Sequence, residues 1–185
     1  MTEFEKRRSP RAFSPKKIST ENIEKLFEAA STAPSAYNEQ PWKYIYATKE
    51  NPEAFAKFLN CLIPFNQNWA KESCLLVLSI AKKFLERNNN PNKYYLHDTG
   101  AANAYMVLQA TNLGFQGHQM GGYDRDKTIE TFNIDTEKYE PVTFIAFGYE
   151  ADISTLSEEK KLQETKPRER KEISEFVIKI EDKKY

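Results

Sequence analysis

Residues 7–11 read Arg7-Arg8-Ser9-Pro10-Arg11, and residues 33–42 read Ala33-Pro34-Ser35-Ala36-Tyr37-Asn38-Glu39-Gln40-Pro41-Trp42. The first stretch places three guanidinium groups around one hydroxyl, which offers about fifteen N–H donors to a small anion. The second stretch is a polar loop between prolines, and its neutral amides and hydroxyls suit a heterocycle better than a charge. Together the two stretches predict one phosphorylated aromatic cofactor. A basic run alone is also typical of a solvated N-terminus.

Length and charge limit the kind of protein that this chain can be. Its 185 residues suffice for one domain with a full core but hardly for two, so we expect a single domain over residues 1–185. Lys plus Arg and Asp plus Glu both number 27, so no overall charge draws the chain to nucleic acid or to an anionic membrane. The longest apolar run, residues 74–81, is far shorter than the ~20 residues that cross a bilayer.

Cysteine and histidine usage predicts a cytoplasmic protein without a metal site. Cys61 and Cys74 show no Cys-x-x-Cys spacing, and the charged N-terminus carries no export signal, which together indicate reduced thiols. The two histidines, His97 and His118, are far apart in the sequence and do not complete a ligand pattern with either cysteine.

Helical and strand patterns alternate along the chain and predict a mixed fold. Helices are expected at residues 2–8, 20–33, 52–59 and 95–113, and after a cap at Asp124. Strands are expected at residues 42–48, 74–81 and 141–148, and the last two should be covered on both faces because they are continuously apolar. No Gly-x-Gly-x-x-Gly follows a strand and no Walker sequence is present, which argues against a classical dinucleotide domain.

Three segments are expected to lie outside the regular elements. Residues 114–122 hold four of the six glycines and predict a loop in which the backbone approaches something closely. The acidic residues 150–164 predict a solvated linker. Residues 173–180 fit either a helix or an extended arm, and the pattern does not choose between them.

The two opening stretches, in this order, resemble the nitroreductase family of FMN-dependent oxidoreductases. The resemblance continues nearly to the end of the chain, in Asp98-x-Gly100-Ala101-Ala102, in Gly117-His118-Gln119-Met120-Gly121-Gly122, in the strand that ends at Gly148, and in the basic residues 166–171. It implies an α+β fold, a three-layer α/β/α sandwich with a mostly antiparallel central sheet and a C-terminal arm over about residues 165–185. It also implies a homodimer with FMN at the subunit interface.

The resemblance implies a set of FMN-binding residues. The phosphate and ribityl chain would be held by Arg7, Arg8, Ser9 and Arg11, and from the far end of the chain by Arg168 and Arg170, with Lys166 a weaker candidate. The flavin would be reached from the partner subunit by Pro34, Ser35, Ala36 and Asn38, and an amide partner for the ring would be Gln40. The ring near N5 would be approached by Met120, Gly121 and Gly122. Arg168 and Arg170 also fit the solvated end of the charged linker.

No side chain is predicted to be catalytic, because flavin N5 carries the chemistry and the Gly121 backbone lies beside it in the resemblance. His118 is an alternative proton donor, although a histidine in a glycine-rich segment also fits a positional role. Trp42 is expected to be a core residue that anchors the loop before it.

The function that the resemblance implies is hydride transfer from NADH or NADPH through FMN to a nitroaromatic, quinone or related small acceptor, with ping-pong kinetics. The alternative is a flavin-binding or flavin-reducing protein whose product is reduced FMN. A basic RNA-binding module is disfavoured by the zero net charge. The chain lacks the long insertions that shape the substrate pocket in larger members of the family, so its acceptor is not specified by the resemblance.

Overall fold

The computed structural model describes residues 2–179, and these form a four-stranded sheet. The strands run in the order β1-β2-β4-β3, and their bounds are β1 (Trp42–Thr48), β2 (Leu75–Lys82), β3 (Gln116–Met120) and β4 (Tyr139–Gly148). Each neighbouring pair is antiparallel. The apolar strands β2 and β4 occupy the centre, as the sequence predicts, because central strands need apolar side chains on both faces.

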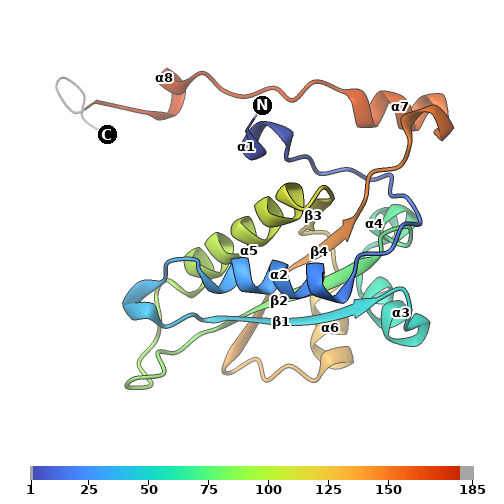
Figure 1. Cartoon of the computed structure of the whole chain (residues 1–185). Coiled ribbons are helices and arrows are strands. Elements are labelled where there is room, and N and C mark those ends of the chain that lie inside the picture. The colour runs from blue at the N-terminus through green and yellow to red at the C-terminus, as the bar shows by residue number, and fades with distance from the viewer. Residues whose placement is uncertain (1, 180–185) are drawn as a thin grey trace.

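Helices cover both faces of the sheet (Figure 1). One layer contains α2 (Thr20–Ser31) and α5 (Tyr95–Asn112), and the other contains α3 (Pro52–Cys61), α4 (Pro64–Ala70) and α6 (Arg125–Phe132). Side chains alternate along β2, so Leu75 and Val77 join the core under α2 and α5. Leu76 and Leu78 join the core under α3 and α4. This arrangement confirms the predicted α+β three-layer sandwich with an antiparallel sheet.

Side-chain caps fix where several helices begin. Ser19 Oγ accepts a hydrogen bond from the Asn22 backbone N–H at 3.2 Å, and the Asn51 side chain accepts from that of Ala54 at 3.1 Å. Each bond satisfies one of the donors that the first turn of a helix leaves unpaired. Helix α5 ends before Gly114, whose φ of 84° is the left-handed conformation expected after a helix.

Two elements of the sheet and its helical layers were not predicted from the sequence. The segment that was expected to be a glycine-rich loop contains edge strand β3, and Gly117 is needed there because a Cβ would lie 2.5 Å from the Phe147 ring. Helix α4 was missed because polar residues interrupt its apolar pattern, although Trp69 and Ala70 are buried. Both errors arose because packing against the sheet outweighs local sequence preference.

In Figure 1, helix α1 and the segment that follows β4 lie above the α5 layer. The predicted acidic linker contains η2 (Ile153–Thr155) and an exposed helix, α7 (Glu158–Thr165), and α1 (Glu3–Lys6) packs beside α5. Beyond α7 the chain runs away from the sheet to the single turn α8 (Ile173–Phe176) and continues extended. Ile173 and Phe176 there are 70% and 63% exposed. The rest of the predicted arm, residues 180–185, lies outside the described residues.

Among residues 2–179, no helix combines the length and the apolar character that crossing a bilayer requires.

Candidate functional site

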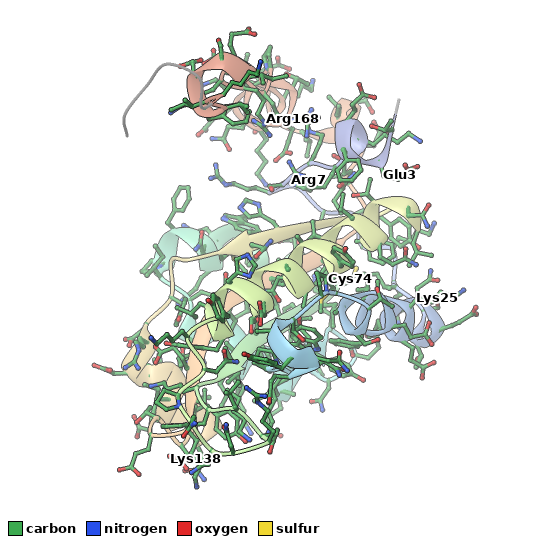
Figure 2. All side chains as sticks on the ribbon, turned by 90° about the vertical axis from the view of Figure 1, so that its left-hand side faces the viewer. Glu3, Arg7, Lys25, Cys74, Lys138 and Arg168 are labelled. Atoms are coloured by element: carbon green, nitrogen blue, oxygen red, sulfur yellow. The ribbon has the colours of Figure 1, made fainter. Side chains whose placement is uncertain are left out.

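Arginines from both ends of the chain gather at one end of the sheet. We call this group the arginine cluster, and its members are Arg7, Arg8, Arg11, Arg168 and Arg170. The Arg168 guanidinium donates hydrogen bonds to the backbone carbonyls of Arg7 and Glu5, and Figure 2 shows Arg168 pointing toward Arg7. Burial lowers the pKa of Arg7, and the neighbouring charges of Arg168 and Arg170 lower it further. The positive charges therefore crowd together closely enough to repel one another.

The arginine cluster has a carboxylate nearby but, within residues 2–179, forms no ion pair with it: burial raises the pKa of Glu150, and the charge of Arg8 opposes this shift. Within the described residues none of its five members forms an ion pair, whereas the remaining two arginines, Arg87 and Arg125, are each paired with a glutamate. Arg125 has two such bonds to Glu140, at 2.9 and 3.1 Å. Arg7, Arg8 and Arg11 are half-buried, whereas Arg168 and Arg170 are exposed, and half-buried cations are stabilised by a nearby anion.

Edge strand β3 positions the turn at Ser9. Nδ1 of His118 donates to the Pro10 carbonyl at 2.9 Å, and this fixes the protonated ring nitrogen because a carbonyl can only accept. The Gln116 side chain accepts from the Arg8 backbone N–H at 3.0 Å. Ser9 Oγ accepts from Arg7 Nη1 at 3.1 Å. The predicted phosphate-binding residues therefore share one anchored turn.

Arg11 carries a buried donor that lacks an acceptor. Its Nε is buried without a hydrogen-bond partner in the part of the chain that the structure describes. The guanidinium lies 5.1 Å from the ring centre of Phe65, and Arg11 lines a cavity of about 220 Å³ between α4 and α7. A buried donor that finds no acceptor costs about 1–3 kcal/mol. The described residues do not supply the hydrogen-bond acceptor that this buried donor needs.

The C-terminal segment also contacts residues 8–11. The Arg8 guanidinium donates to the Glu164 carbonyl, and the Arg11 backbone N–H donates to Glu164 Oε1 at 2.8 Å. Arg168 and Arg170 are exposed; Arg168 donates to the backbone at Arg7, and the charge of Arg170 contributes to lowering the pKa of Arg7. Lys166 follows α7 as its C-terminal cap, and no contact joins it to the arginine cluster within the described residues.

The second predicted half of the site, residues 34–40, lies at the opposite end of the sheet (Figure 1). Trp42, where β1 begins just after the loop, pairs with Ala81, whereas the end of the sheet next to the arginine cluster holds Gln116 and its partner Gly148. Strand β1 alone spans about 20 Å. Within one chain, therefore, the loop does not reach the arginine cluster. Trp42 is partly buried against the core, as expected.

The 34–40 loop has an unusual backbone. Tyr37, Asn38 and Gln40 have φ values of 56°, 58° and 46°, which is the left-handed region that non-glycine residues rarely adopt. Ser35 Oγ accepts from the Gln40 backbone N–H at 3.0 Å, and Asp98 Oδ2 accepts from that of Ala36 at 2.9 Å. The exposed side chains of the loop are those of Pro34, Tyr37, Asn38 and Gln40. Hydrogen bonds to Ser35 and Asp98 therefore fix the loop backbone, while the exposed side chains remain accessible.

The two glycines after β3 have different surroundings. A Cβ on Gly122 would lie 2.7 Å from both Asn66 Nδ2 and Ile63 Cδ1, so a side chain there would have to displace these two groups. A Cβ on Gly121 would meet nothing within 4 Å. Met120, which ends β3, is buried at 2% exposure and cannot present its side chain to a ligand. Of this predicted trio, Gly121 is the residue with open space above its backbone.

His118 is placed as an anchor. Burial lowers its pKa, the hydrogen bond to Pro10 partly opposes this, and the charge of Arg11 lowers it further. The ring centre of His118 lies 4.5 Å from that of Trp69. A neutral imidazole between Trp69 and the turn at Pro10 favours the positional role over proton donation. His97 is exposed and lies 3.0 Å from Asp98.

Comparison with known proteins agrees with this geometry. A model of the nitroreductase family matches residues 4–149. The Bacillus subtilis protein YdgI, named as an NAD(P)H nitroreductase, is 29% identical over 79% of this chain and 86% of its own length. The CLA biosynthesis enone reductase of Lactiplantibacillus plantarum is 27% identical, over 77% of this chain and 81% of its own.

A solved structure described as an oxidoreductase containing FMN superposes with a TM-score of 0.88 at 30% identity, covering 97% of this chain and 90% of that one. These similarities bear out the predicted class of enzyme, FMN-dependent NAD(P)H oxidoreductases. The extent of the family match, over more than half of the chain, shows that the protein belongs to the nitroreductase family.

Proposed function

We propose that this protein uses FMN to transfer a hydride from NADH or NADPH to a small nitroaromatic, quinone or enone acceptor. The observation that carries the proposal is the arginine cluster, which forms no ion pair within the described residues. The phosphate of FMN is close to a dianion at neutral pH, and its burial requires several hydrogen-bonding cations. Arg7, Arg8 and Arg11 beside Ser9 offer these groups at one turn.

Two further observations support FMN over a simple phosphate. The exposed side-chain amides of Asn38 and Gln40 could pair with the polar edge of the flavin ring. The open space at Gly121 would accept a planar group against the backbone. Residues for the phosphate, for a polar edge and for a flat face are thus all present, and the residues fit the cofactor.

When bound, FMN would supply the redox chemistry, carrying a hydride equivalent from NAD(P)H to the acceptor, which takes the accompanying proton from solvent. The task of the chain is to leave one face of the ring open so that the two substrates can lie in turn at about 3–3.5 Å, a near-attack distance. Backbone N–H groups near Gly121 and the charge of Arg11 would stabilise negative charge that develops on the ring. One pocket used in turn predicts ping-pong kinetics, with parallel double-reciprocal lines.

A homodimer completes the proposed site. The 34–40 loop and the arginine cluster lie at opposite ends of the sheet, so both can bind one flavin only if they come from two chains. The apolar arm residues Ile173, Phe176 and Val177 are more than half exposed, and a second subunit would bury them. Sedimentation at micromolar concentration should give a dimer, whereas a monomer that still holds FMN would contradict this part of the proposal.

The test of the proposed function is the visible spectrum of the purified protein. We expect a yellow protein with about one FMN per chain, and colourless protein should take up FMN on titration. Protein that never binds FMN would overturn the proposal. Turnover with NADH and NADPH against nitroaromatic, quinone and enone acceptors then identifies the substrates, and release of free reduced FMN would instead indicate a flavin-reducing protein.

A further inference from the structure

Asp98 is a buried carboxylate outside the predicted set of FMN-binding residues. It lies in the first turns of α5 and is 4% exposed. Its Oδ2 accepts the Ala36 backbone N–H at 2.9 Å, and its Oδ1 lies 3.0 Å from Nδ1 of the exposed His97. No lysine or arginine forms an ion pair with it within residues 2–179. A charged group is rarely buried with so little compensation unless it has a specific task.

The bond from Ala36 to Asp98 lies at the start of the strained part of the loop. Tyr37 and Asn38 follow Ala36 directly, and both are in the left-handed region. Such a conformation costs about 1–3 kcal/mol for each residue and persists only where surrounding contacts enforce it. The carboxylate of Asp98 supplies the first of these contacts, and Ser35 Oγ supplies a second through Gln40.

The outer side of the loop is free to bind. Asn38 is exposed, and its side-chain amide makes no hydrogen bond within the described part of the chain. A loop that is already fixed in its binding conformation loses less entropy on binding, which increases affinity. The strained backbone therefore presents exposed groups such as the Asn38 amide and contributes nothing to the packing of the core.

We propose that Asp98 is a positioning residue for the flavin: its buried carboxylate holds the Ala36 N–H, and so presents residues 34–38 to the FMN bound by the arginine cluster of a second copy. This inference rests on the proposed function. It assigns Asp98 no contact with the cofactor and no part in proton transfer.

The test compares substitutions that keep or remove the acceptor at position 98. Asp98→Asn keeps an oxygen that can accept from Ala36, so the Kd for FMN should stay within roughly fivefold of wild type. Asp98→Leu fills the same space without an acceptor, and the Kd should rise at least about tenfold. The visible circular dichroism of the remaining bound FMN should also change in Asp98→Leu, because the ring would meet an altered loop.

Two further variants separate positioning from stability. Asn103, on the same helix, is 1% exposed and accepts from Tyr44 and Ser79 at 3.0 Å each, so Asn103→Leu should destabilise the fold without altering the Kd for FMN. Ala36→Pro removes the N–H donor itself, and should weaken FMN binding as Asp98→Leu does, even if the latter folds poorly. Ser35 before it is extended (φ −146°, ψ 153°), which is compatible with a following proline.

The outcomes are distinct. Wild-type protein that binds no FMN would refute the proposed function, and the inference with it. FMN binding that is normal in wild type and unchanged in Asp98→Leu and Ala36→Pro would overturn the positioning role alone. Equal weakening in Asp98→Leu and Asn103→Leu would also overturn it, because the effect would then reflect general destabilisation of α5.

Discussion

The arginine cluster and the 34–40 loop recognise different chemistry from opposite ends of the same sheet. At the arginine cluster, cations lack counter-ions and are held through backbone carbonyls, as Arg168 is held by Arg7 and Glu5. In the loop, the Asp98 carboxylate and the Ser35 hydroxyl accept from backbone N–H groups, while neutral side-chain amides are exposed. The guanidinium groups of the arginine cluster form no ion pair within the described residues, whereas the loop backbone already has hydrogen-bond partners. The difference is the basis of our proposal that the arginine cluster binds the phosphate and the loop binds the ring.

This comparison also explains why one chain would be inactive alone. In the proposed dimer each chain would supply the arginine cluster to one flavin and the 34–40 loop to the other, because the length of the sheet keeps the two regions of one chain apart. The following substitutions test the two halves separately.

The largest effect is expected at the arginine cluster. Arg11→Ala removes a charged donor whose Nε has no partner within the described residues. We therefore expect the substitution to weaken ligand binding and to change the stability of the fold little. We expect FMN binding to weaken by about 2–3 kcal/mol, roughly 30- to 150-fold. Fluorescence titration of apoprotein with FMN measures this. Arg125→Ala, which breaks the surface pair with Glu140, is the matched control and should leave the Kd unchanged.

The next effect separates the two glycines. Gly121→Val should leave the fold intact, because its Cβ meets nothing, but its bulk should push the flavin from the backbone and slow reduction by NAD(P)H by up to about 100-fold. Gly122→Val should instead lower the thermal midpoint, because of the clash with Ile63 and Asn66. Stopped-flow reduction of flavin-loaded protein is the measurement. Wild-type rates in Gly121→Val would show that the ring lies elsewhere.

A smaller effect is expected from His118. His118→Ala should keep most of its turnover once loaded with FMN, because the imidazole anchors Pro10 and does not face an open site. Abolished flavin reduction in the flavin-loaded variant would show that the His118 side chain takes part in the reaction.

His118 also predicts a pH dependence of stability. Its pKa in the folded protein is lowered by burial, so the unfolded chain takes up the proton more readily below the unperturbed value of about 6.5. The stabilising contribution is therefore complete above that pH and declines as the pH falls towards the folded pKa. Urea unfolding at pH 7.5 and 5.5 should show a smaller loss of stability in His118→Gln than in wild type.

The smallest effect is expected from Arg87, which contacts the outer side of the 34–40 loop. Arg87 lies over the Tyr37 ring at 3.6 Å and 3.8 Å from the Glu39 carboxylate, but it is half exposed. Exposed contacts of this kind contribute about 0.5–1 kcal/mol. Arg87→Ala should therefore weaken FMN binding by less than Asp98→Leu does, and a larger loss would make Arg87 the main support of the loop.

Local signals in the sequence were sufficient for much of the fold. Caps at Ser19, Asn51 and Asp124 and the apolar runs of β2 and β4 depend on neighbouring residues, and these elements were found. Strand β3 was not, because Gly117 signals a loop until Phe147 is seen packed against it. Long-range contacts carry no such local signal.

The candidate site divides in the same way. The arginines and the loop were recognisable as motifs, and their roles in FMN binding stay predictions. The support from Asp98 was not recognised, since it acts on Ala36, 62 residues away. Nor could the sequence show that Arg11 Nε lacks an acceptor or that Gly121, unlike Gly122, has open space.

The central claim is that each flavin is held by the arginine cluster of one chain and the loop of the other. Co-expression of Arg11→Ala with a Ser35→Ala, Asn38→Ala double variant, under two affinity tags, tests it directly. Each variant alone should bind FMN weakly. The mixed dimer should recover about one tightly bound FMN per two chains, because one of its sites combines an intact arginine cluster with an intact loop. Wild type paired with a chain that carries all three substitutions should have no intact site. Tight binding in that second pairing and none in the first would show that both halves act within one chain, and would contradict the account.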